Sequence, residues 1–315
     1  MFGDMRAIGF DTKGDFEVLK VVERDVRAAG PKEVRIRVKA AAVNPTDLLF
    51  RELGNGDAPR PWIPGMDAAG VIESVGSEVD RLRVGDRGMA ACSPKRPEGG
   101  AQSELLVVPA ASVVAIPDHA SLAQASTLPM NGLTALLGLR EIALSAGQTL
   151  AVSGGAGLLA HFVIVVAKLR GLRVIADAKP ADVDRVKRYG ADLVIPRTDQ
   201  FADEVRKVAP NGADALFDTA VLSEQAFGAV KDGGAHVVVR GWPKDKAEPP
   251  RGIKMHPILV ATVLERTDWL EELRDLASKG AITLEVAGEY PPERAADAQR
   301  AMAAGGLRGR AVIVF

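Results

Sequence analysis

The sequence predicts an α/β protein with a β-rich first part and a doubly wound parallel sheet in the middle of the chain. Two observations lead to this. Residues 33–40 alternate strictly between polar and apolar, with Val34, Ile36 and Val38 on one face, as expected of a half-buried strand. From about residue 121, strand-like and helix-like segments alternate. Such alternation is typical of a parallel sheet covered by helices.

The β-rich part occupies about the first 120 residues. Further strand-like segments follow at 70–75 and 101–108. Turn signals separate these segments, at 55–56, 84–88 and 94–100.

The middle of the chain predicts five strands, at 150–153, 173–177, 193–196, 215–218 and 236–239. Helices are expected between them, at 157–170, 181–189, 202–208 and 223–230. Residues 162–166 favour a strand by propensity, but a helix that is apolar all round is a buried helix, so we assign them to the helix. The strand at 236–239 is apolar enough to serve as a pairing edge of the sheet.

The last part of the chain predicts a loop followed by a mixed segment. Residues 241–257 are rich in proline, lysine and glycine and predict a loop. Beyond it we expect a helix, a strand, a helix and a final strand, at 268–278, 282–286, 292–302 and 311–315.

Length and composition narrow the classes of function. The chain has 315 residues, 47% apolar and 26% charged, which is enough for two well-buried domains. Forty basic and 41 acidic residues give a net charge of −1, which provides no electrostatic reason to expect a nucleic acid or an anionic membrane as partner. The longest apolar run, 162–167, is too short to span a bilayer. The single cysteine, Cys92, excludes an intrachain disulfide and favours a cytoplasmic location.

The most informative motif joins the strand at 150–153 to the helix that follows it. Gly155, Gly157 and Ala160 fit the Gly-x-Gly-x-x-Ala form of the dinucleotide fingerprint. Gly155 permits the tight turn, Gly157 lets the backbone approach a pyrophosphate, and Ala160 lets the helix pack closely on the strand. The free N–H groups at the helix start favour phosphate. The residues predicted to bind the cofactor in this turn are Gly154, Gly155, Ala156, Gly157, Leu158 and Leu159.

Two residues after the second strand of this region bear on the choice of dinucleotide. Asp177 lies 20 residues after Gly157, where an acidic residue normally bonds the ribose 2′-OH and favours NAD. Lys179 lies two positions further and could instead bind a 2′-phosphate. The residues alone leave both alternatives open.

Several ordered motifs resemble those of the medium-chain dehydrogenase/reductase superfamily, and within it the zinc-independent quinone oxidoreductase (zeta-crystallin-like) family. They are Ala-Val-Asn-Pro-Thr-Asp at 42–47, Pro-Gly-Met-Asp-Ala-Ala-Gly-Val at 64–71, Val-Gly-Asp-Arg at 84–87, Leu-Pro-Met-Asn-Gly-Leu-Thr-Ala at 128–135, the glycine-rich turn, Tyr-Gly-Ala-Asp at 189–192 and Gly-Leu-Arg-Gly-Arg at 306–310. The resemblance covers nearly the whole chain.

The resemblance implies a GroES-like β-domain at 1–120, a Rossmann domain at 121–260 and a return to the first domain at 261–315. It also implies a homodimer formed through edge strands of the Rossmann sheets. NADPH is the expected cofactor, with NADH as the alternative that Asp177 keeps open.

The departures from the zinc-dependent relatives predict that no metal is bound. Those relatives carry a cysteine ligand in the segment that holds Asn44, and a histidine at the position of Met66. Neither ligand is present here, and methionine is not a zinc ligand. The structural four-cysteine lobe is also missing. Without a Lewis acid, the natural reaction is hydride transfer from the cofactor to an already activated acceptor, namely a quinone or an α,β-unsaturated carbonyl.

The acceptor is expected near Asn44, Thr46 and Asp47, in the motif at 42–47. Asn44 can donate to an acceptor oxygen, although an Asn-Pro turn without chemistry is the alternative. Asp47 is more often a structural carboxylate than a general acid, so solvent is the first candidate for the proton. Leu48, Leu49 and Phe50 stand where the family often has a tyrosine, which puts a tyrosine proton donor in doubt.

Two further groups of residues are expected at the nicotinamide. Asn131 and Thr134 begin the second domain, where they contact the nicotinamide or cap a helix. Arg240, Gly241 and Trp242 follow the fifth strand of the sheet, with Trp242 lining the cleft or packing in the core. Leu158 stands where the family has glycine, so its side chain either narrows the pocket or packs inward. Arg308 and Arg310 either touch the adenosine phosphate or cap a turn.

These expectations combine into one function with two alternatives. We expect a zinc-free NAD(P)H-dependent oxidoreductase that reduces a quinone or an enone. The alternatives are an enoyl-thioester reductase of the same superfamily and a nucleotide-binding protein without catalysis.

Overall fold

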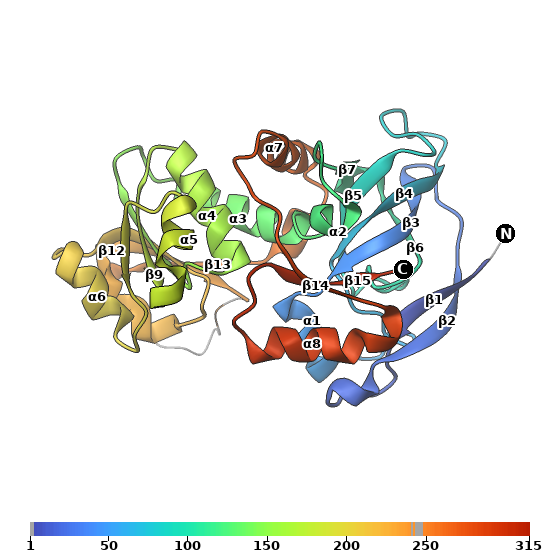
Figure 1. Ribbon diagram of the computed structural model, residues 1–315, viewed down its shortest axis with the longest axis horizontal. Coiled ribbons are helices and arrows are strands. Elements are labelled where there is room, and N and C mark those ends of the chain that lie inside the picture. Colours follow the sequence, from blue (N-terminus) through green and yellow to red (C-terminus); the bar gives the residue numbers. More distant parts are fainter. Residues whose placement is uncertain (1–2, 241, 243–247) are drawn as a thin grey trace. The chain divides into compact units, whose positions relative to one another are not determined.

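The computed structural model describes residues 3–240, 242 and 248–315, and these form two compact units (Figure 1). The first unit comprises Met1–Met130 and Val263–Phe315, and the second comprises Asn131–Thr262. The chain therefore leaves the first unit once and returns to it for its last 53 residues.

The first unit is built around a seven-stranded sheet in the order β14-β15-β3-β4-β5-β7, with β6 paired to β3. A separate hairpin-like pair is formed by β1 and β2. The strands of the first unit are β1 (Gly3–Gly9), β2 (Lys20–Val26), β3 (Glu33–Ala42), β4 (Asp67–Val75), β5 (Arg87–Ala91), β6 (Leu105–Pro109), β7 (Val113–Ala115), β14 (Val286–Tyr290) and β15 (Arg310–Val314). Its helices are α1 (Pro45–Leu53), α2 (Leu122–Ala125), α7 (Thr267–Ser278) and α8 (Ala295–Ala304).

The alternation seen in the sequence sets the core of this sheet. Val34, Ile36 and Val38 of β3 are at most 1% exposed, and they pack with Ile72 of β4. Strand β15, near the end of the chain, pairs with β3, near its beginning. The two strands are antiparallel, with Val312 opposite Ala42.

The second unit is a six-stranded parallel sheet in the order β10-β9-β8-β11-β12-β13. Its strands are β8 (Thr149–Ser153), β9 (Arg173–Ala178), β10 (Leu193–Pro196), β11 (Ala213–Asp218), β12 (Val230–Val239) and β13 (Lys254–Ile258). Its helices are α4 (Leu158–Leu169), α5 (Val183–Arg188) and α6 (Phe201–Val208). Helix α3 (Pro129–Ile142) begins two residues before the start of this unit at Asn131 and continues into it. The predicted fold class, an antiparallel-rich β-domain with a doubly wound parallel sheet, is confirmed.

Short 3₁₀ segments connect many of these elements. They are Phe16–Val18, Ala110–Ser112, Pro180–Asp182, Ser223–Ala229, Pro250–Gly252, Val260–Thr262 and Pro292–Arg294. The helix expected at 223–230 is thus a 3₁₀ segment that ends at Ala229, because Val230 already pairs in β12.

Helix α4 is buried on all sides, as the assignment of 162–166 to a helix requires. Phe162, Val163 and Ile164 are each 0% exposed. The helix packs against β8 and β9, and α5 packs beside it on β9 and β10 (Figure 1). Tertiary burial therefore outweighs the strand propensity of its β-branched residues. None of the described helices has the length and hydropathy needed to cross a bilayer.

Three expectations about elements were wrong. The region 241–257, expected to be a loop, contains most of β13 (Lys254–Ile258). The apolar residues Met255 and Ile258 give only a weak strand signal, because proline and charged residues dominate the surrounding sequence. As a consequence, β12 is an inner strand, and the edge on this side of the sheet is β13. The strand expected at 282–286 lies instead at Val286–Tyr290, beside β15.

Gly138 of α3 packs closely against the parallel sheet of the second unit. A β-carbon at Gly138 would lie 2.4 Å from Cε2 of Phe217 and 2.9 Å from Cγ1 of Val237, and Phe217 is 0% exposed. We predict that Gly138→Ala lowers the free energy of unfolding by about 1–3 kcal/mol, because overpacking exceeds the gain of about 1 kcal/mol in helix propensity. Urea unfolding measures this, and an unchanged or higher midpoint would contradict the packing described here.

Candidate functional site

The glycine-rich turn lies between β8 and α4, at the centre of the parallel sheet. On either side of β8 are β9 and β11, so the strand order reverses at this point, which is where open α/β sheets bind ligands. Gly154 adopts a φ of +70°, a conformation that favours glycine. A β-carbon at Gly155 would lie 2.6 Å from the carbonyl oxygen of Asp177. Only glycine fits there without moving the backbone of β9.

The start of α4 is open to an anion. Gly157 is its N-cap residue, in an extended conformation, and no side chain caps the helix. The first N–H groups of a helix have no partners within it and carry its positive dipole end. Leu158 is 3% exposed, so it packs inward instead of narrowing a pocket. Ala156 and Leu159 are half-buried.

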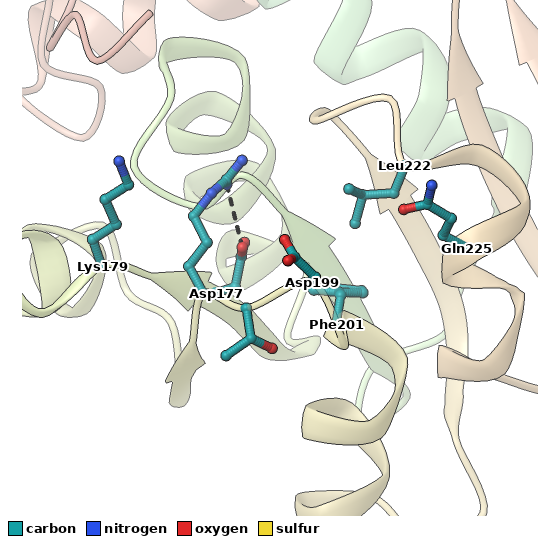
Figure 2. A pocket seen from close by; sticks show the side chains of 8 residues that line it. Asp177, Lys179, Asp199, Phe201, Leu222 and Gln225 are labelled. Carbon is teal, nitrogen blue, oxygen red and sulfur yellow. Dashed lines mark hydrogen bonds and ion pairs between the residues drawn. The ribbon is translucent and has the colours of Figure 1, made fainter.

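Asp177 lies directly beneath this turn, at the end of β9. Its Oδ1 accepts the N–H groups of Gly154 (2.5 Å) and Gly155 (3.2 Å). Its Oδ2 forms an ion pair with Nη1 of Arg197 at 3.2 Å, drawn as the dashed line in Figure 2. Burial raises the pKa of Asp177, and the Arg197 guanidinium and the two N–H donors oppose that rise. The carboxylate thus holds the turn and a cation at once.

A cavity of about 270 Å³ opens beside Asp177 (Figure 2). It is lined by Asp177, Lys179, Arg197, Thr198, Asp199, Phe201, Leu222 and Gln225. The sequence predicted Asp177 and Lys179 but missed Arg197. The signal was available, because Arg197 follows β10, and the carboxyl ends of parallel strands meet at one edge of the sheet.

A second buried carboxylate, Asp218 at the end of β11, braces the same edge. It accepts the hydroxyl of Ser153 (2.6 Å) and the N–H groups of Leu222 (3.0 Å) and Ser223 (2.7 Å). It is 0% exposed. Asp218 therefore fixes the segment that carries Leu222, one wall of the cavity.

The residues expected at the nicotinamide lie in the second unit. Asn131 and Thr134 are buried in the first turns of α3, at 3% and 7% exposure. Arg240 is exposed at the end of β12 with a φ of +71°. Trp242 is half-buried with its ring 5.9 Å from that of Phe227. Gly241 lies outside the described residues.

Asn44, expected at the acceptor, lies in a buried polar network of the first unit. Its Nδ2 donates to Asp67 (2.6 Å), its Oδ1 accepts from Nε of Arg310 (2.9 Å), and its backbone N–H donates to Asp47 (2.7 Å). All of these side chains are at most 8% exposed. The Asn44 amide is thus committed to the protein itself. Arg310 lies in this network, so it serves neither of the roles considered for it in the sequence.

Asp47 is also held by structural contacts, as its second oxygen accepts the N–H of Gly65 at 2.8 Å. Burial raises the pKa of Asp47 to about 7, and the two N–H donors and Arg310 only partly oppose this. Burial likewise raises the pKa of Asp67 to about 7, helped by the nearby Asp47 charge. Two carboxyls face one guanidinium here, so the network binds a proton near neutral pH.

Thr46 differs from its neighbours. Its hydroxyl oxygen is buried and has no hydrogen-bond partner among the described residues. A buried hydroxyl without a partner costs free energy. Of the three residues predicted in this motif, Thr46 therefore has the group with unused hydrogen-bonding capacity.

The described residues contain no cluster of three or more histidine, cysteine, aspartate or glutamate side chains that could hold a metal ion. Cys92 is 3% exposed, and its Sγ lies 3.6 Å from the carbonyl oxygen of Gly65. Met66 is buried at 6% exposure.

The buried network predicts a specific pH dependence of stability. Asp67 has a pKa of about 7 in the folded protein against an ordinary value of 3.8. Between these values the folded state binds more protons than the unfolded state, so the free energy of unfolding falls as pH rises from about 4 to 7. We predict that Asp67→Asn makes this slope shallower by up to about 1.4 kcal/mol per pH unit, although it lowers stability overall by breaking a buried hydrogen bond.

Urea unfolding at pH 5, 6, 7 and 8 measures the slope. The control is Asp57→Asn, an exposed carboxylate of the same unit, which should leave the slope unchanged. A wild-type slope in Asp67→Asn would show that Asp67 does not titrate in this range.

Comparisons with known proteins place the chain in a family. Residues 30–118 match the alcohol dehydrogenase GroES-like domain, and residues 189–313 match the zinc-binding dehydrogenase domain. Two plant enzymes are each 31% identical over 98% of this chain and 79% of their own length. They are the tomato (Solanum lycopersicum) 2-methylene-furan-3-one reductase and the chloroplastic NADPH-dependent alkenal/one oxidoreductase of Arabidopsis thaliana.

A solved structure agrees with these relatives. The quinone oxidoreductase of Pseudomonas syringae is 26% identical and superimposes with a TM-score of 0.87, covering 99% of this chain and 100% of that one. The resemblance seen in the motifs is thereby confirmed. The chain belongs to the medium-chain dehydrogenase/reductase superfamily, in the branch of its quinone and alkenal/one oxidoreductases.

Proposed function

We propose that the protein is an NADPH-dependent oxidoreductase that transfers a hydride to a quinone or to an α,β-unsaturated carbonyl compound. The observation that carries this proposal is the glycine-rich turn at the reversal point of the parallel sheet, with a cation-lined cavity beside it. The relatives named as NADPH-dependent alkenal/one oxidoreductase and as quinone oxidoreductase support the cofactor and the class of acceptor.

The residues present fit a dinucleotide. The uncapped start of α4 offers N–H groups for a pyrophosphate, and the close approach at Gly155 holds the turn in place. Gly157 has no side chain to cover the backbone at the start of α4, so a phosphate can approach the N–H groups there. A β-carbon at Gly157 would contact only the carbonyl oxygen of Gly154. We assign the pyrophosphate to Gly154, Gly155, Ala156, Gly157, Leu158 and Leu159, and the adenosine to the cavity beside Asp177 and Lys179.

We assign the nicotinamide end to Asn131, Thr134, Arg240, Gly241 and Trp242. When bound, a reduced nicotinamide supplies a hydride to the electron-poor carbon of a conjugated acceptor. In an α,β-unsaturated carbonyl acceptor, a hydride added at the β carbon would shift the C=C electron pair toward the carbonyl oxygen, and a proton from solvent at the α carbon would complete the reduction. The protein contributes position and hydrogen-bond donors.

At the acceptor end we assign the donor role to Thr46, because its hydroxyl is buried without a partner. Asn44 and Asp47 act as positioning residues, since their polar groups already hold α1 and the 64–67 segment. This revises the first choice made from the sequence, in which Asn44 itself faced the acceptor.

We propose that the reaction needs no zinc. Met66 stands where zinc-dependent relatives have a histidine ligand, and the segment that holds Asn44 lacks their cysteine ligand. Cys92 is a buried thiol whose pKa burial raises to about 12. A thiol that does not ionise is a poor metal ligand.

We also propose a homodimer and a cytoplasmic location. The strand at 236–239 is an inner strand of the second unit, whose sheet ends at β10 and β13, and we assign the pairing to β13, which has the exposed Leu259 just beyond it. The single buried cysteine is in keeping with a reducing compartment.

Turnover with defined acceptors tests the function. We predict that the purified protein oxidises NADPH when 9,10-phenanthrenequinone or but-3-en-2-one is present. We expect at least tenfold higher kcat/KM for NADPH than for NADH, and no loss of activity after treatment with EDTA or 1,10-phenanthroline. The measurement is the decay of absorbance at about 340 nm.

The other outcomes separate the competing functions. Turnover only with enoyl thioesters would reassign the acceptor class. NADPH binding without turnover of any acceptor would favour a non-catalytic nucleotide-binding protein. Loss of activity on chelation would contradict the zinc-free chemistry.

A further inference from the structure

The carboxylate of Asp177 is engaged by groups of the protein itself. Both of its oxygens already have partners, namely two N–H groups of the turn and the guanidinium of Arg197. Its side chain is only 4% exposed. A carboxylate that selects NAD must accept a hydrogen bond from the 2′-OH within the cavity. Asp177, which in the sequence suggests a preference for NAD, therefore holds the glycine-rich turn and Arg197 in the structure.

Arg197 is placed by two contacts at the rim of the same cavity. Its backbone N–H donates to the carbonyl oxygen of Ala178 at 3.0 Å, which fixes the residue beside the end of β9. One terminal nitrogen, Nη1, pairs with Asp177. The remaining guanidinium nitrogens, Nε and Nη2, have no hydrogen-bond partner among the residues that the structure describes, and the side chain is 40% exposed.

Two further charged residues, Lys179 and Asp199, line the same cavity. Lys179 is exposed and also lacks a partner within the described chain. Asp199 is an exposed carboxylate on the lining, so it opposes an anion there. Asp177 is compensated by three donors, so Arg197 and Lys179 are the positively charged groups of the lining that can attract an anion. A planar guanidinium can hold a carboxylate with one nitrogen and a phosphate with the others.

We propose that Arg197 is the residue that selects NADPH, by binding the adenosine 2′-phosphate, and that Asp177 is its positioning residue. The inference rests on the proposed function, because it names the group that distinguishes the two cofactors at the same site. Lys179 supplies a second positive charge. An NADH molecule would leave both cations without a phosphate partner, and this loss produces the discrimination.

Two small nucleotides isolate the phosphate. The compounds 2′,5′-ADP and 5′-AMP differ only in the 2′-phosphate, and isothermal titration calorimetry measures the Kd of each. We predict that Arg197→Ala weakens binding of 2′,5′-ADP about tenfold to a hundredfold, the range expected for charge-assisted hydrogen bonds. Binding of 5′-AMP should change by less than about twofold.

Two further variants sharpen the test. Arg197→Lys keeps the charge but cannot bond Asp177 and a phosphate through separate nitrogens, so its affinity for 2′,5′-ADP should lie between those of the wild type and Arg197→Ala. Lys207→Ala removes an exposed charge of α6 that pairs only with Glu204 among the ion pairs described, and it should change neither Kd.

The contrary results are distinct. Wild-type affinity for 2′,5′-ADP in Arg197→Ala, in a protein that still uses NADPH, would overturn the role of Arg197 alone. Equal losses for both nucleotides would also overturn it, because Arg197 would then support the cavity and not the phosphate. A wild-type protein that binds neither NADPH nor NADH would reject the proposed function, and this inference with it.

Discussion

The carboxylate of Asp177 is the interaction on which the nucleotide site depends. It accepts two N–H groups of the glycine-rich turn and pairs with Arg197, so one buried group joins the carboxyl ends of β8, β9 and β10. The turn can approach it closely only because Gly155 has no side chain. A buried charge is tolerated when it is fully paired, and this pairing fixes the position of the cation at the cavity rim.

The first unit depends on a comparable polar network at a different place. Asn44, Asp67 and Arg310 come from three distant segments of the sequence, and their hydrogen bonds join α1, β4 and β15. These hydrogen bonds help to hold the returning end of the chain in the first unit. An Arg310 that faced solvent elsewhere would leave two buried carboxyls without a counter-charge. The same contacts commit Asn44 to structure and leave Thr46 as the polar group at this motif with an unused hydrogen bond.

Much of the fold could be predicted because its signals are local. The alternation at 33–40 and the turn at 154–160 each report their own backbone, and the structure forms β3 and the β8–α4 connection at those places. The roles of Asp177 and Asn44 could not be predicted in this way, because their partners lie 20 and 266 residues away. Arg197 could have been predicted to lie near Asp177, because it follows the predicted strand at 193–196, but its pairing with the carboxylate is visible only in the structure. Strand β13 was missed because proline and lysine dominate its surroundings, and its pairing with β12 is a tertiary effect.

We propose that this chain directs a hydride to the conjugated carbon of an activated acceptor. The decisive experiment uses NADPH in which both hydrogens at C4 of the nicotinamide are replaced by deuterium, with but-3-en-2-one as acceptor and NMR of the product. We predict deuterium at the carbon β to the carbonyl and a solvent-derived proton at the α carbon. Deuterium on the carbonyl carbon would mean alcohol formation, and an absence of label would mean that no hydride passes from NADPH. Either result would contradict hydride transfer from NADPH to the conjugated carbon.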